Sequence, residues 1–158
     1  MEKVIVNWDD TVRVEGLTLR LPDWIVRDLM LHDTSSIQLT LLIYSIITRL
    51  LLDEFGEEWR SAFMDRVSAS ISASNWRHDG PIETVADVTL DLSTGMVDLF
   101  GQDELSRAIE LSRAIEDIIV AFVVMSVLLI RERGKSWYSE FVARYERVAL
   151  TRYPHLRR

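Results

Sequence analysis

The sequence contains no cysteine, and it has only six glycines and three prolines in 158 residues. The absence of cysteine excludes disulfides, thiolate catalysis and zinc sites that use sulfur ligands. It also fits a reducing compartment, and we therefore expect a cytoplasmic protein. The few glycines form neither a phosphate-binding loop nor the G-x-S-x-G turn that presents a nucleophilic serine.

Long apolar segments are also scarce. The longest, Ile118–Ile130, is interrupted only by Ser126 and is bounded by Asp117 and Arg131. As a helix it would span roughly 20 Å, which is shorter than the roughly 30 Å hydrocarbon layer of a membrane. The first residues, Met1–Val4, also lack the pattern of a signal peptide. We expect a buried helix here and no membrane association.

Charge is unevenly distributed along the chain. The formal net charge is −7, yet residues 131–158 hold eight basic and three acidic side chains. The acidic remainder argues against binding of nucleic acid over the whole surface. A local basic face remains open, as does a basic tail that docks on the acidic body of a neighbouring copy.

A pattern that includes tryptophan, a rare residue, occurs twice. Gly56–Arg66 and Gly134–Arg144 both read G-x-x-W-x-S-x-F-x-x-R, at an offset of 78 residues. The same offset places Tyr44–Glu54 over Phe122–Glu132 without a gap. Such self-similarity indicates a duplicated unit. We predict repeat one over about residues 11–76 and repeat two over about 88–153, within one domain that spans 1–158.

Alternating residues predict a β-hairpin at the start of each unit. In the first, Thr11–Val14 and Leu17–Leu21 flank a turn at Glu15-Gly16. In the second, Val88–Leu92 and Met96–Phe100 flank a turn at Ser93–Gly95, and Thr89–Leu92 matches Thr11–Val14. A period of two gives a strand one apolar face. We expect the two hairpins to form one small antiparallel sheet.

Helices should make up most of each unit. Pro22-Asp23 is typical of a helix start and predicts a short helix to Leu31, followed by a helix over about residues 36–55. In the second half one helix should run from about Gln102 to Arg133. Gly56 and Gly134 should end the two long helices, because glycine readily takes positive φ.

The helices differ in how much of their surface is apolar. Residues 37–52 and 118–130 are apolar on nearly all sides, so we expect these two helices to pack on each other or on a partner. The last helix of each unit has one aromatic stripe with a spacing of four, formed by Trp59, Phe63, Val67 and Ile71 and by Trp137, Phe141 and Tyr145. The expected fold is α+β and mostly helical, with a small antiparallel sheet packed on helices about a pseudo-two-fold axis.

One segment resembles a catalytic motif. Val4–Val12 is similar to the first motif of haloacid dehalogenase-like phosphatases, in which an apolar strand precedes D-x-D-x-T. In that family the first aspartate is the nucleophile, but Asn7 occupies its position here. An amide cannot form the aspartyl-phosphate intermediate, and the lysine of that family has no counterpart. Neither metal nor cofactor patterns occur elsewhere, and we therefore expect a protein that is not an enzyme.

Arginines mark the candidate binding residues. Arg66 and Arg144 occupy the same position in both units, where they would pair with acidic neighbours or contact a phosphate or carboxylate. The basic C-terminal tail, residues 144–158, mixes arginine with tyrosine, which suits a nucleic-acid backbone or a helix C-terminus. The candidate binding residues are Arg66, Arg144, Arg147, Arg152, Tyr153, Arg157 and Arg158.

These observations favour a non-enzymatic protein–protein interaction protein. It would act as a homo-oligomer, or as a small subunit or inhibitor in a larger assembly, because its apolar helices exceed what one domain readily covers. One alternative is nucleic-acid backbone binding through the basic C-terminal helix. Another is binding of a small anionic ligand at the interface between the repeats.

Overall fold

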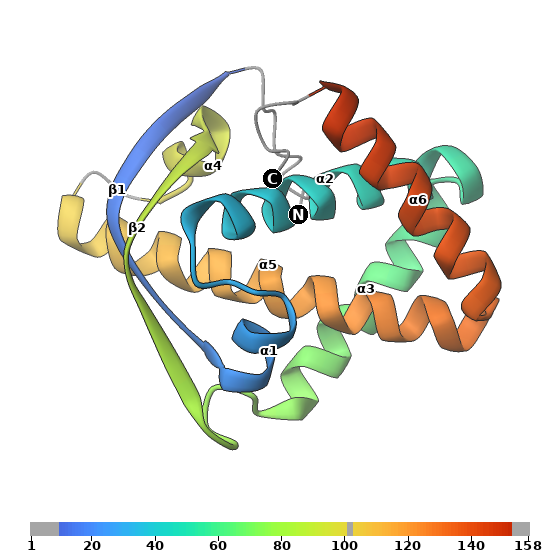
Figure 1. Ribbon diagram of the computed structural model, residues 1–158, viewed down its shortest axis with the longest axis horizontal. Coiled ribbons are helices and arrows are strands. Elements are labelled where there is room, and N and C mark those ends of the chain that lie inside the picture. The colour runs from blue at the N-terminus through green and yellow to red at the C-terminus, as the bar shows by residue number, and fades with distance from the viewer. Residues whose placement is uncertain (1–9, 101–102, 153–158) are drawn as a thin grey trace.

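The structure is a computed structural model in which residues 10–100 and 103–152 are described (Figure 1). It is mostly helical with a small antiparallel sheet, which confirms the α+β class. The order of a strand, a short helix, a long helix and an 18-residue helix occurs twice. The elements are β1 (Thr11–Pro22), α1 (Asp23–Asp28), α2 (Thr34–Phe55), α3 (Glu57–Ser74), β2 (Ile82–Ser93), α4 (Thr94–Asp98), α5 (Glu104–Arg133) and α6 (Lys135–Arg152).

The predicted hairpins are wrong. Within the described residues, β1 pairs only with β2, antiparallel, from Thr11 opposite Ser93 to Pro22 opposite Ile82. Glu15-Gly16 does not reverse the chain, because a register shift accommodates both residues and Gly16 takes a φ of +70°. After β2, the Ser93 hydroxyl accepts a hydrogen bond from the Met96 N–H at 3.1 Å and starts α4 in place of a turn.

The buried face of the sheet shows the expected period of two. It consists of Leu17, Leu19 and Leu21 from β1 and of Val88, Leu90 and Leu92 from β2. Positions of equal burial in the strands lie 71 residues apart, whereas the two 18-residue helices correspond at 78. The difference falls in the long helices, because α5 has 30 residues and α2 has 22. Internal duplication stays a prediction.

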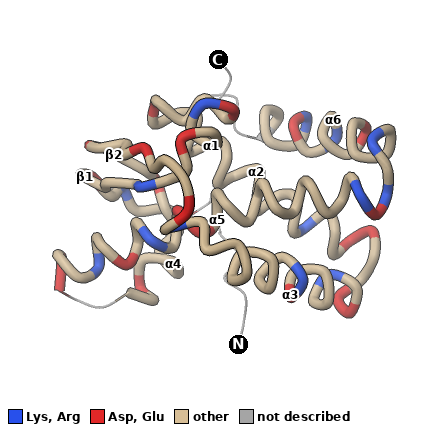
Figure 2. The backbone as a smooth tube through the Cα atoms, turned by 90° about the horizontal axis from the view of Figure 1, so that it is seen from below, with Lys and Arg blue, Asp and Glu red and all other residues tan. Residues whose placement is uncertain are grey.

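The two long helices pack on each other at the centre, as predicted. Ile47 and Leu51 of α2 lie in one cluster with Met125 and Leu129 of α5. α3 and α6 lie on opposite sides of this pair (Figure 2). Their stripes contribute Phe63 and Phe141 as the largest fully buried side chains. The aromatic stripes therefore belong mainly to the core.

Among the described helices, α2 is long and apolar enough to cross a membrane by length and composition alone. Core helices pass the same test. In the fold, α2 contacts α3, α5, α6 and β2, which is the surrounding of a core helix.

Gly56 and Gly134 join the long helices to α3 and α6. Their φ and ψ angles are 88° and 169°, and 92° and 159°, which is a region that only glycine occupies readily. These values differ from the left-handed helical conformation that commonly ends helices. Both glycines thus set the angle between consecutive helices.

Replacing either glycine by alanine should lower the free energy of unfolding by about 2 kcal/mol. No atom lies within 4 Å of a Cβ added at either position, so the cost would come from the backbone alone. Urea denaturation of Gly56→Ala and Gly134→Ala measures it. Gly95→Ala is the control, because that glycine has no positive φ and equally free space. Equal stability of all three variants would contradict the prediction.

Candidate functional site

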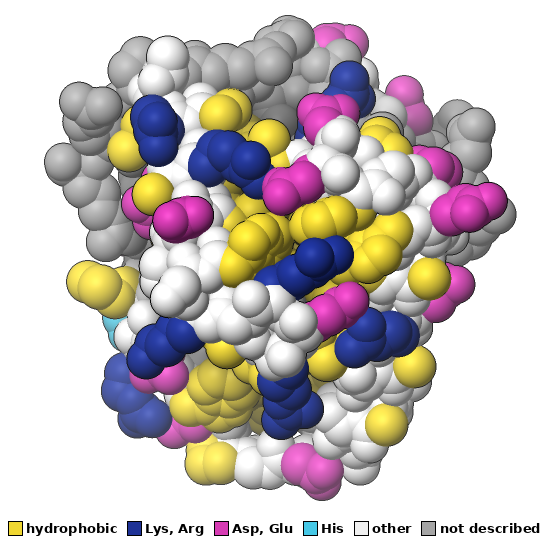
Figure 3. Space-filling view, turned by 90° about the vertical axis from the view of Figure 1, so that its right-hand side faces the viewer, with side chains coloured by type: hydrophobic (Ala, Val, Ile, Leu, Met, Phe, Trp, Pro, Cys, Tyr) yellow, Lys and Arg dark blue, Asp and Glu magenta, His cyan; other side chains and the backbone are white. Residues whose placement is uncertain are grey.

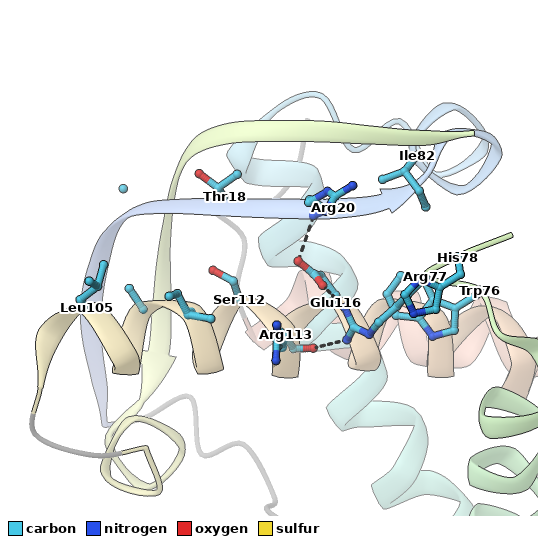
Figure 4. Close-up of a pocket in the computed structure, with 13 residues that line it drawn as sticks. Thr18, Arg20, Trp76, Arg77, His78, Ile82, Leu105, Ser112, Arg113 and Glu116 are labelled. Atoms are coloured by element: carbon cyan, nitrogen blue, oxygen red, sulfur yellow. Dashed lines mark hydrogen bonds and ion pairs between the residues drawn. The ribbon is translucent and has the colours of Figure 1, made fainter. Parts of the chain in front are cut away.

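A groove of about 770 Å³ separates β1 from the first half of α5 (Figure 4). Gly16, Thr18 and Arg20 line it from β1, and residues 105–116 line it from α5. The connection from α3 to β2 closes one end with Trp76, Arg77 and His78. We call this hollow the β1–α5 groove.

A buried carboxylate holds the groove together. Glu116 is only 4% exposed, and its Oε2 accepts a hydrogen bond from the backbone N–H of Arg20 at 2.9 Å. Its Oε1 forms an ion pair with the Arg77 guanidinium, which also donates to Asp117 Oδ1 at 2.6 Å and to the Arg113 carbonyl at 3.3 Å. This network fastens both β1 and the α3–β2 connection to α5.

Gln38 has the corresponding position on α2, 78 residues earlier. Its Nε2 donates to the Asp91 carbonyl at 2.9 Å, and its Oε1 accepts from the Asp91 N–H at 2.8 Å. An amide therefore satisfies both main-chain groups on the outer edge of β2. A carboxylate can only accept, so Glu116 binds the N–H of Arg20 and provides no donor for its carbonyl.

The remaining cations in the groove have no ionic partner. Arg20 and Arg113 are exposed, and neither forms an ion pair within residues 10–100 and 103–152. Leu105 and Ile109 on α5 are 71% and 50% exposed. They precede Arg113 at intervals of four residues and so share its helix face. The groove thus combines free positive charge with exposed apolar surface.

A second, more apolar groove of about 550 Å³ lies between α1, α2, α5 and α6, with Trp24 46% exposed at its rim. Several hydroxyls that line it are bonded internally. Thr40 donates to the Ser36 carbonyl at 2.9 Å, and Tyr138 donates to Ser126 Oγ at 2.6 Å. Burial, and then the neighbouring Tyr138, raises the pKa of Tyr145 far above its usual value. These groups serve packing in the groove wall.

Arg66 and Arg144 are ion-paired across the halves. Arg66 donates to Glu132 Oε2 at 3.0 Å, and Arg144 forms an ion pair with Glu54. The pairs lie at the end of the molecule where hydrophobic side chains gather beneath basic ones (Figure 3). There Arg133 covers the Phe55 ring at 4.2 Å. This geometry matches the first of our two interpretations of the arginines, and ligand binding by them stays a prediction.

The other candidate residues belong to the basic C-terminal tail. Arg147 is exposed on α6 without an ion pair among the described residues, and Arg152 ends α6. Tyr153, Arg157 and Arg158 lie outside the described residues, as does the Asn7 segment. Of the described candidates, none lines the β1–α5 groove. Nucleic-acid binding through this tail stays a prediction.

No described group of three or more histidine, aspartate and glutamate side chains is arranged to hold a metal ion. No known protein family, curated protein or solved structure matches the chain. Its function must therefore be inferred from the geometry.

Proposed function

We propose that the protein is a non-enzymatic protein-binding module and that it binds its partner in the β1–α5 groove. The observation that carries this proposal is the exposure of Leu105 and Ile109 beside the unpaired guanidinium groups of Arg20 and Arg113. Exposed apolar side chains flanked by arginine are characteristic of protein interfaces, where a partner removes them from water.

The state of the polar groups supports binding over catalysis. Glu116 is the carboxylate that lines the groove, and both of its oxygens are occupied. His78 is exposed, and no described carboxylate hydrogen-bonds its imidazole. A general base needs a free lone pair close to its substrate, and an imidazole base is usually oriented by a second group.

A library of random octapeptides displayed on phage tests this function. We expect selection on the folded protein to enrich peptides whose binding is lost in the Leu105→Asp, Ile109→Asp variant. Aspartate would place charge against the apolar part of the partner and should weaken binding at least tenfold. Fluorescence anisotropy with the synthesised peptides measures the change.

Val148→Asp is the matched control, because Val148 is also an exposed apolar residue on a helix but lies outside the groove. Peptides that bind the groove variant and the control equally well would place the binding surface elsewhere. Failure to enrich any peptide would overturn the proposal.

The partner is either a second copy or another protein, and light scattering of the purified chain separates the two cases. A dimer at micromolar concentration that dissociates in the Leu105→Asp, Ile109→Asp variant would identify a second copy. A monomer would point to a different protein.

A further inference from the structure

We infer that the partner segment is a short, extended, acidic stretch that adds to the outer edge of β1 as a third strand. This inference rests on the proposed function and specifies the chemistry and the geometry of the ligand. Three observations support it: open main-chain groups on β1, the dimensions of the groove and its charge.

The outer edge of β1 has main-chain groups available for pairing. In an antiparallel pair, a residue directs both its N–H and its carbonyl either toward the neighbouring strand or away from it. Because the Arg20 N–H points to Glu116, its carbonyl must also face away from β2. Thr18 lies two residues earlier on the same side, and it has no pairing partner on β2. These groups face the groove.

The corresponding edge of β2 is less accessible. Both main-chain groups of Asp91 are already bonded to Gln38, so an added strand would first have to displace that side chain. On β1, Glu116 binds the N–H of Arg20 and leaves the carbonyl available. The structure therefore favours β1 as the edge that accepts a strand.

The groove has suitable dimensions for a short strand. Gly16–Arg20 would span roughly 17 Å at 3.3 Å per residue, and the hollow beside them has a volume of about 770 Å³. α5 forms the opposite wall, so a bound segment would lie between a strand edge and a helix. Strand edges with such a neighbour recognise peptides by main-chain bonds and by alternate side chains.

Charge and hydrophobicity determine the expected side chains. The groove is lined by Arg20, Arg77 and Arg113 against the single carboxylate of Glu116. Side chains of an added strand alternate between its two faces. One set would contact Leu105 and Ile109, and the other would lie near the arginines. A segment that alternates apolar and acidic residues satisfies both surfaces.

A fluorescein-labelled octapeptide of alternating valine and glutamate tests the inference by fluorescence anisotropy. We expect saturable binding that weakens with salt, and at least tenfold weaker binding when lysine replaces glutamate. Arg113→Glu should weaken binding at least tenfold. Arg131→Glu should not, although Arg131 is also exposed on α5 without an ion pair among the described residues.

Backbone methylation distinguishes strand addition from contacts by side chains alone. Only alternate N–H groups of an added strand face β1. N-methylation of one alternate set should therefore weaken binding at least tenfold, while N-methylation of the other set should have a much smaller effect. Equal binding of both methylated peptides would overturn strand addition.

The outcomes also separate this inference from the proposed function. If library peptides bind through Leu105 and Ile109 but the valine–glutamate peptide does not, the acidic strand is wrong and the protein-binding function stands. If 10 mM inorganic phosphate displaces the octapeptide completely at constant ionic strength, the groove is a simple anion site and the inference fails. If no peptide of either kind binds, both proposals fail.

Discussion

Replacing Glu116 by alanine should lower the free energy of unfolding by about 3 kcal/mol. The substitution removes the acceptor of the Arg20 N–H and leaves the Arg77 guanidinium, which is two-thirds buried, without one of its two carboxylate partners. Breaking a buried pair on one side is costly because the remaining group keeps its desolvation penalty. Urea denaturation followed by circular dichroism measures the loss.

Glu116→Gln should cost less than about 1 kcal/mol. Glutamine at this position can accept from the Arg20 N–H and donate to its carbonyl, as Gln38 does at Asp91, while Arg77 keeps its bond to Asp117. Equal losses for the alanine and glutamine variants would show that the charge pair, and not the strand contact, provides the stability. Asp117→Asn is a surface control, because the Asp117 side chain is more than half exposed.

Truncation of either central aromatic residue should have the largest effect on stability. Phe63→Ala and Phe141→Ala should each cost about 4 kcal/mol, because both side chains are fully buried in the cluster between α2, α3, α5 and α6. Each ring also stacks on a tryptophan, Trp59 at 5.0 Å and Trp137 at 4.9 Å between centroids. Chemical denaturation gives both values.

The less severe Phe63→Leu and Phe141→Leu variants should retain a measurable unfolding transition if the alanine variants do not fold. Val148→Ala is the surface control for the α6 variant and should change stability by less than about 0.5 kcal/mol. A loss below about 1 kcal/mol at either phenylalanine would contradict the assignment of these rings to the core.

The helices were predictable because their signals are local. Asp23 starts α1, and glycines at 56 and 134 end the long helices where the sequence indicated. The two strands were only half recognised. Residues 11–14 and 17–21 were correctly identified as extended, but Glu15-Gly16 has the composition of a turn and occurs here at an irregularity inside one strand.

The second predicted hairpin failed for another reason. Residues 96–100 alternate weakly between apolar and polar, and so short a segment cannot distinguish a strand from one helical turn. The Ser93 hydroxyl decides between them by capping α4. Its sequence signal, a serine three positions before the first buried apolar residue of the turn, was available.

The groove could not be predicted, because it depends on residues that are distant in sequence. Arg20 and Glu116 are 96 residues apart, and no local pattern brings them together. One signal was present: Gln38 and Glu116 are polar residues at matching positions inside helices that are otherwise apolar. The partners of Arg66 and Arg144 were more accessible, because Glu54 and Glu132 correspond at the same offset as the arginines.

The Gln38 contact with Asp91 also bears on whether the protein can form fibrils. Growth of a sheet through successive copies requires two open edges on each molecule. With the edge of β2 occupied at Asp91, two copies that met edge to edge would pair β1 with β1 and stop at a closed dimer. A single glutamine side chain thus limits lateral assembly to one round.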